Sequence, residues 1–252
     1  SSQLDMDRLD YLRRDSFFTG VTEGNIGSAR IIKMLNVVDD NLAVDSKGIY
    51  SIENYLTSRR LMYWQVYLHK TTVGYEKLLV NLLSRAKYLA DQGETLFATP
   101  ALHFFLYNHI DKEAFVDNAE PLQHYKMLDD SDIWASVKAW TTHRDPILSL
   151  LSRNLIDRRI FKVEVRSTAV EEAEVMDIRH QIAQRYGLSF DDPAYLVNVS
   201  TIRKDMYDIH DDHISILYKD GTIKDITEAS EILNISLLSK KICKYYLCYQ
   251  RF

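Results

Sequence analysis

Between residues 78 and 89 the chain reads Leu78-Leu79-Val80-Asn81-Leu82-Leu83-Ser84-Arg85-Ala86-Lys87-Tyr88-Leu89. Apolar residues recur here every three or four positions, the spacing that places them on one face of an α-helix. The pattern belongs to a segment from Ser51 to about Gly93 that contains no proline. It predicts one long helix or two consecutive helices. Gly93 is the predicted stop, because glycine readily adopts the left-handed conformation that ends helices.

The chain on either side of this segment is also mainly helical. Asp145 and Pro146 form a typical helix start, an N-cap followed by a proline in the first turn. Ile31-Ile32 and Leu42-Ala43-Val44 flank Asp39-Asp40-Asn41 and predict a β-hairpin between residues 30 and 50. The other predicted helices cover residues 4–18, 100–109, 129–140 and 146–157.

The pattern changes after residue 157. One helix is predicted here, at 169–186. Strands that alternate polar and apolar residues are predicted at 161–165, 195–202, 214–218, 222–226 and 244–249. We therefore expect a mainly α fold in two parts. Residues 1–157 form a helical bundle with a β-hairpin insert, and residues 158–252 form a small α+β lobe.

Composition excludes several classes of protein. Hydrophobic residues make up 46% and charged residues 27% of the 252 positions, which argues against disorder. No apolar run approaches the roughly 20 residues of a membrane-spanning helix, so we expect no membrane partner. The net charge of -5 argues against an extended nucleic-acid-binding surface. We expect a cytoplasmic protein with no signal peptide, in which Cys243 and Cys248 are reduced core residues.

A first stripe of functional side chains lies near the start of the chain. On a helix, Asp7, Arg8, Tyr11, Arg14 and Asp15 fall within an arc of about 120°. A carboxylate can bind a divalent metal, a guanidinium can bind phosphate oxygens, and a tyrosine can pack against a sugar or base. The stripe is suited to a metal-bound phosphorylated ligand. The alternative is a solvated helix face of ion pairs four residues apart.

A second stripe repeats the theme on the long helix. Arg59, Tyr63, Val66, Tyr67 and Lys70 lie within about 100° of one another. The cations suit phosphates, and the tyrosine rings suit a ribose or nucleobase. The alternative is an amphipathic helix whose tyrosines and lysine stem cover apolar surface.

Other groups of polar residues in the sequence are weaker candidates for a functional site. Asp205, Asp208, His210, Asp211, Asp212 and His213 lack the helical spacing of a metal site and the residue order of an EF-hand, so we interpret them as a solvated loop. The chain has no glycine-rich phosphate loop and no motif for a serine or cysteine nucleophile. Covalent catalysis therefore has no candidate.

The first stripe resembles a known family. The run from Gln3 to Asp15, followed by Thr19-Gly20-Val21, is similar to the last metal-ligand segment of HD-domain phosphohydrolases, in particular the deoxynucleoside triphosphate triphosphohydrolases. The similarity continues through the hairpin, the segment from Arg59 to Lys70, Leu128-Asp129-Asp130, and the segment from Arg158 to Lys162. It implies that residues 1–157 are the C-terminal part of an HD-type helical domain.

This resemblance implies a role for individual residues. Asp7 would be a ligand of a divalent metal, whose identity (Mn, Mg, Fe, Ni or Zn) stays open. Arg8 and Arg59 would contact phosphates. Tyr11 would contact the sugar, Asp15 the 3′-hydroxyl, and Tyr67 the base, with Tyr63 as a further substrate contact next to Tyr67. His69 and Lys70 would lie at a regulatory nucleotide site between subunits. The implied reaction converts a dNTP to a deoxynucleoside and triphosphate, and the implied assembly is a homo-oligomer.

The chain departs from the family pattern in one respect. The first histidine and the His-Asp pair that precede the aspartate motif in the family are absent. We therefore expect this chain to be a C-terminal piece of a longer phosphohydrolase, and to be inactive alone because one carboxylate cannot hold a catalytic metal. Two alternatives stay open: a non-catalytic nucleotide-binding or oligomerisation module, and a purely structural helical scaffold.

Overall fold

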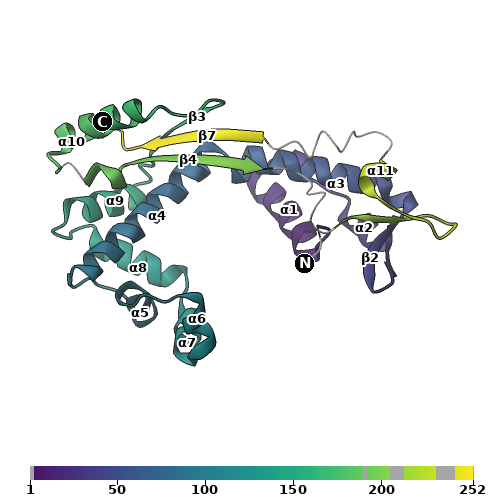
Figure 1. Ribbon diagram of the computed structural model, residues 1–252, viewed down its shortest axis with the longest axis horizontal. Helices are drawn as coiled ribbons and strands as arrows, with labels where there is room; N and C mark the ends of the chain where they lie inside the picture. The colour runs from purple at the N-terminus through teal and green to yellow at the C-terminus, as the bar shows by residue number, and fades with distance from the viewer. Residues whose placement is uncertain (1–2, 190–191, 205–212, 231–241, 252) are drawn as a thin grey trace. The chain divides into compact units, whose positions relative to one another are not determined.

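The computed structural model describes residues 3–189, 192–204, 213–230 and 242–251 (Figure 1). The chain divides into two compact units. The first contains Ser1–Thr72 and Thr201–Lys244, and the second contains Val73–Ser200 and Tyr245–Phe252. The boundary predicted between residues 157 and 158 lies inside the second unit. The fold is mainly α with small sheets, which confirms the predicted class.

The first unit combines helices with a four-stranded sheet. Its sheet has the order β1-β2-β5-β6, in which β2 and β5 are parallel and the other neighbours are antiparallel. Its elements are α1 (Met6–Thr19), η1 (Thr22–Gly24), α2 (Ser28–Lys33), β1 (Leu35–Val38), β2 (Asn41–Asp45), η2 (Ser46–Gly48), α3 (Ile49–Met62), the π-helix η3 (Tyr63–Tyr67), β5 (Ser215–Leu217), β6 (Ile223–Asp225) and α11 (Ile226–Ala229).

The predicted hairpin exists, but its first strand was assigned to the wrong residues. Ile31 and Ile32 are in α2, where Ile31 is buried and Ile32 is half exposed, as expected of an amphipathic helix. The first strand is β1, and the turn to β2 consists of Asp39 and Asp40. Both have positive φ, 50° and 59°, as a two-residue type I′ turn requires.

The core of the first unit joins segments that are far apart in sequence. Ile214, Ile216 and Ile226, beside and within β5, β6 and α11, are fully or almost fully buried in the same apolar cluster as residues of α1, β2 and α3. The β1-β2 hairpin is therefore half of a sheet that the chain completes some 170 residues later. This apolar cluster packs against the inner side of α1 and thereby fixes the helix that carries the first predicted stripe.

The second unit is a set of helices beside a three-stranded sheet of order β3-β7-β4. Two short helices, α6 and α7, were not predicted. The elements are α4 (Lys70–Asp91), α5 (Pro100–Tyr107), α6 (Lys112–Asp117), α7 (Ala119–Met127), α8 (Asp130–Trp140), α9 (Pro146–Ile156), β3 (Lys162–Arg166), α10 (Glu172–Tyr186), η4 (Asp192–Tyr195), β4 (Val197–Lys204) and β7 (Ile242–Tyr249).

The segment predicted as one long helix or two consecutive ones contains two α-helices and a π-helical turn. α3 ends at Met62, η3 follows without a gap, and α4 begins at Lys70. The predicted stop is confirmed, because α4 ends at Asp91 and Gly93 has φ +81°. No helix among the described residues has the length and apolar character to cross a lipid bilayer.

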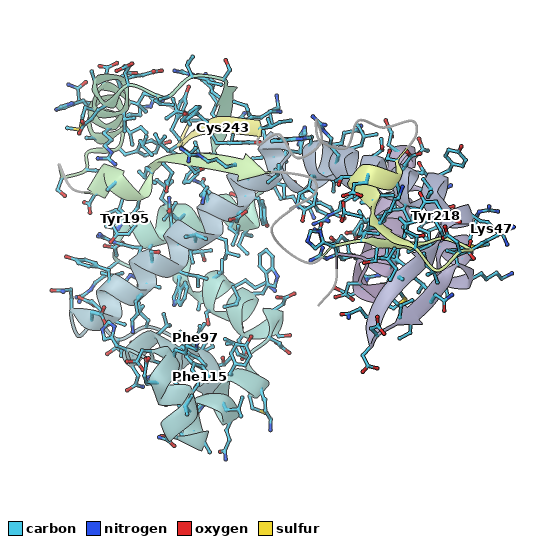
Figure 2. The ribbon with its side chains drawn as sticks, turned by 45° about the vertical axis from the view of Figure 1, so that its right-hand side comes forward. Lys47, Phe97, Phe115, Tyr195, Tyr218 and Cys243 are labelled. Carbon is cyan, nitrogen blue, oxygen red and sulfur yellow. The ribbon has the colours of Figure 1, made fainter. Side chains whose placement is uncertain are left out.

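Aromatic side chains gather at α5–α7, where Figure 2 labels Phe97 and Phe115. The ring of Phe115 packs against Phe105 and Tyr125.

Cys243, labelled in the same figure, is partly buried, whereas Cys248 is fully buried. Both thiols are free, and burial raises the pKa of Cys248 to about 11. The predicted core position therefore holds for Cys248, which is an inert thiol.

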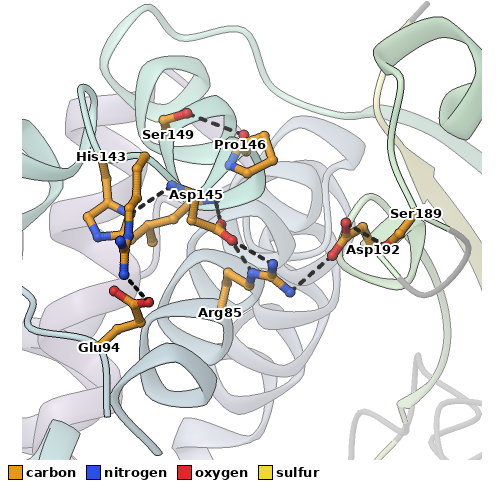
Figure 3. A network of polar contacts seen from close by, with 10 residues as sticks. Arg85, Glu94, His143, Asp145, Pro146, Ser149, Ser189 and Asp192 are labelled. Carbon is orange, nitrogen blue, oxygen red and sulfur yellow. Dashed lines mark hydrogen bonds and ion pairs between the residues drawn. The ribbon is translucent and has the colours of Figure 1, made fainter. Parts of the chain in front are cut away.

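A buried ion-pair network stabilises the second unit (Figure 3). Arg85 on α4 forms a bidentate pair with Asp145, with Nε–Oδ1 and Nη2–Oδ2 distances of 3.1 and 2.6 Å, and Nη1 lies 3.2 Å from Asp192 Oδ1. Asp145 also accepts a hydrogen bond from the backbone N–H of Leu148, which confirms it as the N-cap of α9. Although burial opposes ionisation of Asp145, the hydrogen bonds from Arg85 and Leu148 hold its pKa below the usual range.

We expect Asp145→Asn to lower the free energy of unfolding of the second unit by about 3 kcal/mol, because Arg85 loses its main buried counter-charge. Since the pKa of Asp145 is depressed by folding, the stabilisation is present at neutral pH. It should disappear as the pH falls below about 4. Urea unfolding followed by tryptophan fluorescence measures this, because Trp134 and Trp140 lie in the second unit.

Arg144→Ala provides the control. It removes an ion pair with Glu94 in which the arginine side chain is 75% exposed, so it should cost less than about 1 kcal/mol. Equal losses for the two variants would contradict a special role for the Arg85 network.

Candidate functional site

The side chains of the predicted stripe on α1 differ in how far they are buried. Leu9, Leu12 and Ser16 face the core, while Tyr11 and Asp15 are half-buried. The solvated interpretation holds for Arg14, which pairs with Asp10 at the surface, both with more than half of the side chain exposed. Asp7 is exposed in the first turn of α1, where its N–H donates to Asp5, and Arg8 is half-buried beside it.

Tyr11 and Asp15 meet the π-helix η3. The hydroxyl of Tyr67 donates a hydrogen bond to Asp15 Oδ2 over 2.7 Å. The Tyr67 ring lies edge-on to Tyr11, with centroids 6.0 Å apart, and edge-on to Tyr63 at 5.4 Å. The two predicted stripes are thus brought together. We call the group formed by Tyr11, Asp15, Arg59, Tyr63 and Tyr67 the tyrosine–arginine cluster.

The π-helical turn aligns the residues of the second stripe. In an α-helix, residues four apart are offset by about 40°, so Arg59 and Tyr67 would lie about 80° apart. The wider π-turn, closed by the hydrogen bond from Leu68 N to Tyr63 O, turns each residue by roughly 80° and so reverses most of that offset. Tyr67 therefore returns close to the line of Arg59, with Tyr63 about 40° to one side. The apolar and charged spacing of residues 59–70 predicts a regular α-helix and gives no sign of this turn.

Arg59 is the chemically unusual member of the cluster. It belongs to α3, and the residue is buried, with only 8% of its surface exposed. Its Nε and Nη1 atoms are buried with no hydrogen-bond partner among the described residues, while the guanidinium carbon lies 5.8 Å from the centre of the Tyr63 ring. Burying a charged donor without an acceptor is costly, so such a group indicates a place where a ligand supplies the acceptor.

Tyr11 and Tyr67 are neutral hydrogen-bond donors at physiological pH. Burial, reinforced by the nearby Tyr63 phenol, raises the pKa of Tyr11 to about 12 despite the opposing charges of Arg59 and Arg8. Burial and the hydrogen bond to Asp15 also raise the pKa of Tyr67. Beneath them Tyr55 is fully buried and donates to Gln3 O over 2.8 Å. The cluster therefore presents the Arg59 cation beside uncharged phenols, and the charge of Arg8 also acts on Tyr11.

The remaining predicted residues lie outside this cluster. Val66 packs against the apolar core. His69 and Lys70 are exposed at the start of α4, where His69 Nδ1 accepts a hydrogen bond from Thr71 N–H over 3.2 Å. Their regulatory role stays a prediction. The proposed solvated loop at 205–212 lies outside the described residues, and next to it His213 Nδ1 is 3.0 Å from Asp225 Oδ2.

A metal centre is not built by the described part of the chain alone. Within residues 3–189, 192–204, 213–230 and 242–251, no three histidine, cysteine, aspartate or glutamate side chains are grouped so that they could hold a metal ion. Asp7 offers one exposed carboxylate, which is insufficient for a transition metal. The residues present fit a phosphate-binding surface better than a complete metal site.

The chain is similar to several known proteins. Residues 26–95 match the HD-associated region family. The crystal structure of a phosphohydrolase from Bacteroides thetaiotaomicron is 61% identical, superposes with a TM-score of 0.93, and is matched over 100% of this chain and 62% of its own. The uncharacterized protein YwfO of Bacillus subtilis is 31% identical over 100% of this chain and 56% of its own length.

A third relative carries a more specific name. A deoxynucleoside triphosphate triphosphohydrolase SAMHD1 homolog of Dictyostelium discoideum is 28% identical over 85 residues, 34% of this chain and 16% of its own. The chain thus spans about three fifths of the Bacteroides and Bacillus proteins, and a small part of the Dictyostelium one. The resemblance to phosphohydrolases that the aspartate motif predicted is confirmed.

Tyr11→Phe tests the electrostatics of the cluster. Because folding raises the pKa of Tyr11 to about 12 from 10, its contribution to stability is constant below pH 10 and is lost as the pH rises from about 10 to about 12. The variant should therefore lose less stability than the natural chain over this range. Urea unfolding at pH 8, 10 and 11 measures the difference, and identical alkaline profiles would contradict the assignment.

Proposed function

Because this chain is related to the HD-domain phosphohydrolases, we propose that it carries the nucleotide-binding part of a metal-dependent phosphohydrolase. The proposed reaction converts a dNTP to a deoxynucleoside and triphosphate. The supporting observation is the buried guanidinium of Arg59, which has two N–H donors without an acceptor in the described part of the chain and lies beside the tyrosines of α1 and η3. A phosphate oxygen pair would provide the missing acceptors.

The charges in the cluster suggest how the ligand would be held. Arg8 and Arg59 both act electrostatically on the Tyr11 phenol, opposing the rise of its pKa. We assign the triphosphate to these arginines, where they would stabilise the charge that develops on the leaving triphosphate. Tyr11, Tyr63 and Tyr67 would enclose the sugar and base, because each offers an apolar ring face with a polar tip.

Asp15 would select the sugar hydroxyl. Tyr67 donates to Oδ2 of this carboxylate, which fixes its orientation and leaves the other oxygen to accept a hydrogen bond from a deoxyribose 3′-hydroxyl. Because the pKa of Tyr67 is raised, the phenol keeps its proton and the arrangement is stable across the physiological range. A fixed acceptor of this kind discriminates against ligands that lack the hydroxyl.

The metal would be shared with residues outside this chain. We assign Asp7 as one ligand, and we propose that its counterparts come from the part of the protein that corresponds to the unmatched length of the relatives. A bound divalent metal supplies an activated water in this class of hydrolysis. We further propose a homo-oligomer with His69 and Lys70 at a regulatory nucleotide site, and no turnover by the 252 residues alone.

A non-catalytic nucleotide-binding module is the second candidate. It is favoured by the presence of the arginines and tyrosines in the same compact unit, without a metal-ligand group among the described residues of the chain. The two candidates differ in one measurement. The full natural protein, incubated with Mn²⁺ or Mg²⁺ and each dNTP, should release deoxynucleoside and triphosphate if it is the enzyme. Binding without any product would support the module.

Asp7→Ala should abolish turnover in the full protein without lowering its melting temperature, because this side chain is exposed at the surface of α1. Asp10→Ala is the matched control on the same helix. Asp10 pairs with Arg14 at the surface, outside the tyrosine–arginine cluster, so this variant should keep full activity. Activity that survives Asp7→Ala, or is lost equally in both variants, would contradict the metal assignment.

Arg59→Met should separate binding from stability. Loss of charge-assisted hydrogen bonds to phosphate should weaken dNTP binding by roughly 10-fold to 100-fold, from about 1.5–3 kcal/mol. The free energy of unfolding should stay equal or rise, because an apolar chain of similar length replaces a buried cation that has two donors without an acceptor among the described residues. Calorimetric titration and urea unfolding test the two parts. A strongly destabilised variant would indicate that Arg59 has a structural role instead.

A further inference from the structure

Gly24 packs closely against residues of both α1 and α3. It ends the 3-10 turn η1 and is buried. A Cβ atom placed on Gly24 would lie 2.5 Å from Met62 Sδ, 2.8 Å from Met62 Cγ and 2.8 Å from Ser16 Cβ. Ordinary van der Waals contact begins at about 3.4 Å, so a side chain here would overlap two neighbouring elements by roughly 0.6 to 0.9 Å.

Space, and not backbone conformation, is what requires glycine at this position. The glycines with positive φ are Gly20, Gly93, Gly187 and Gly221, and Gly24 is not among them. Alanine could therefore adopt the same backbone angles without strain. Any effect of Gly24→Ala must come from the separation of the segments that it touches.

The two residues that Gly24 touches adjoin the tyrosine–arginine cluster. Ser16 follows Asp15 on α1, and Met62 precedes Tyr63 at the start of η3. Hydrogen bonds also join the η1 turn and the residue before it to both elements. Ser16 Oγ of α1 donates to Val21 O over 2.7 Å, and Gln65 Nε2 of η3 donates to Glu23 Oε1 over 3.2 Å. A displacement at Gly24 is thus transmitted to both halves of the cluster.

The two contacts would respond differently to an added methyl group. The Met62 thioether is flexible and could rotate away. The Cβ of Ser16 is fixed to the backbone of α1, so the contact is relieved only if α1 and the η1 turn move apart. A shift of about 0.6 Å would stretch the 2.7 Å hydrogen bond between Tyr67 and Asp15 beyond the usual range of O–H···O bonds, about 2.5–3.0 Å.

We propose that Gly24 is a positioning residue that sets the approach of α1 to η3 so that Asp15 meets Tyr67. It acts without touching the ligand. The effect on the Asp15–Tyr67 pair stands on the packing alone, whereas any effect on nucleotide rests on the proposed function.

The packing step is tested without nucleotide. The unfolding free energies of Asp15→Asn, Tyr67→Phe and the double variant give the coupling between the two side chains. This cycle is measured in the natural background, with Gly24→Ala, and with Gly27→Ala. Gly27 is the matched control, since it has negative φ and a methyl group placed on it would have no described atom within 4 Å. Gly24→Ala should abolish the coupling and Gly27→Ala should keep it.

Equal coupling in the three backgrounds would overturn the proposal. If Gly24→Ala does not fold, the cycle is repeated with Gly24→Ala and Met62→Ala together, which frees the side occupied by Sδ and Cγ. This pair should fold with the coupling still lost, because the contact with Ser16 Cβ remains, and retained coupling would overturn the proposal. Failure of the pair to fold, beside a folded Met62→Ala protein, would show that the glycine is needed for folding itself, and would also overturn the proposal.

The functional step uses the full natural protein. Gly24→Ala should raise KM for dNTP about tenfold and change kcat less, because it misplaces residues assigned to the sugar, whereas Gly27→Ala should change neither. Unchanged KM together with lost coupling would leave the packing result intact and reject the sugar assignment of Asp15. A natural protein that turns over no dNTP would reject the proposed function alone, since the coupling is measured independently.

Discussion

The first unit depends on holding a positive charge inside its core. Arg59 is less exposed to water than many of the aliphatic residues of the chain, and two of its donors have no acceptor among the residues that the structure describes. The apolar cluster around Ile52, Tyr55 and Leu56 has to offset this unfavourable burial. Natural proteins retain such a group where it has a use in binding, because an aliphatic residue of similar size would give a more stable core.

The helices and turns around Arg59 fix the positions of the side chains next to it. The π-turn brings Tyr67 back towards the line of Arg59. The 3-10 turn η1 packs so closely against Met62 of α3 and Ser16 of α1 that Gly24 has no room for a methyl group. The phenols contribute because burial keeps them protonated, so they can donate hydrogen bonds without adding negative charge beside a phosphate. Rigid helices place the groups, and the core supplies the rigidity.

The sequence predicted those features that depend on local chemistry. The start of α9 at Asp145 and Pro146 and the stop at Gly93 follow from capping, and most helices follow from apolar spacing. The identity of β1, the π-turn and the union of β2 with β5 were not predicted, because each depends on contacts with distant residues. Asp15 and Arg14 illustrate the same limit at the site: they are adjacent on one stripe, but Asp15 pairs with η3 whereas Arg14 pairs with its own helix.

The parallel pairing of β2 with β5 has a consequence for biosynthesis. Ala43 pairs with Ser215, so the ribosome must deliver more than 170 further residues before this sheet can close. Until then Ile31, Val44 and their neighbours lack the isoleucines that cover them. The intervening residues 73–200 belong to the other unit and can collapse first. Residues 1–72 are translated before the residues that complete their sheet and are thus among the last of this chain to mature, which exposes them to chaperones and proteases during synthesis.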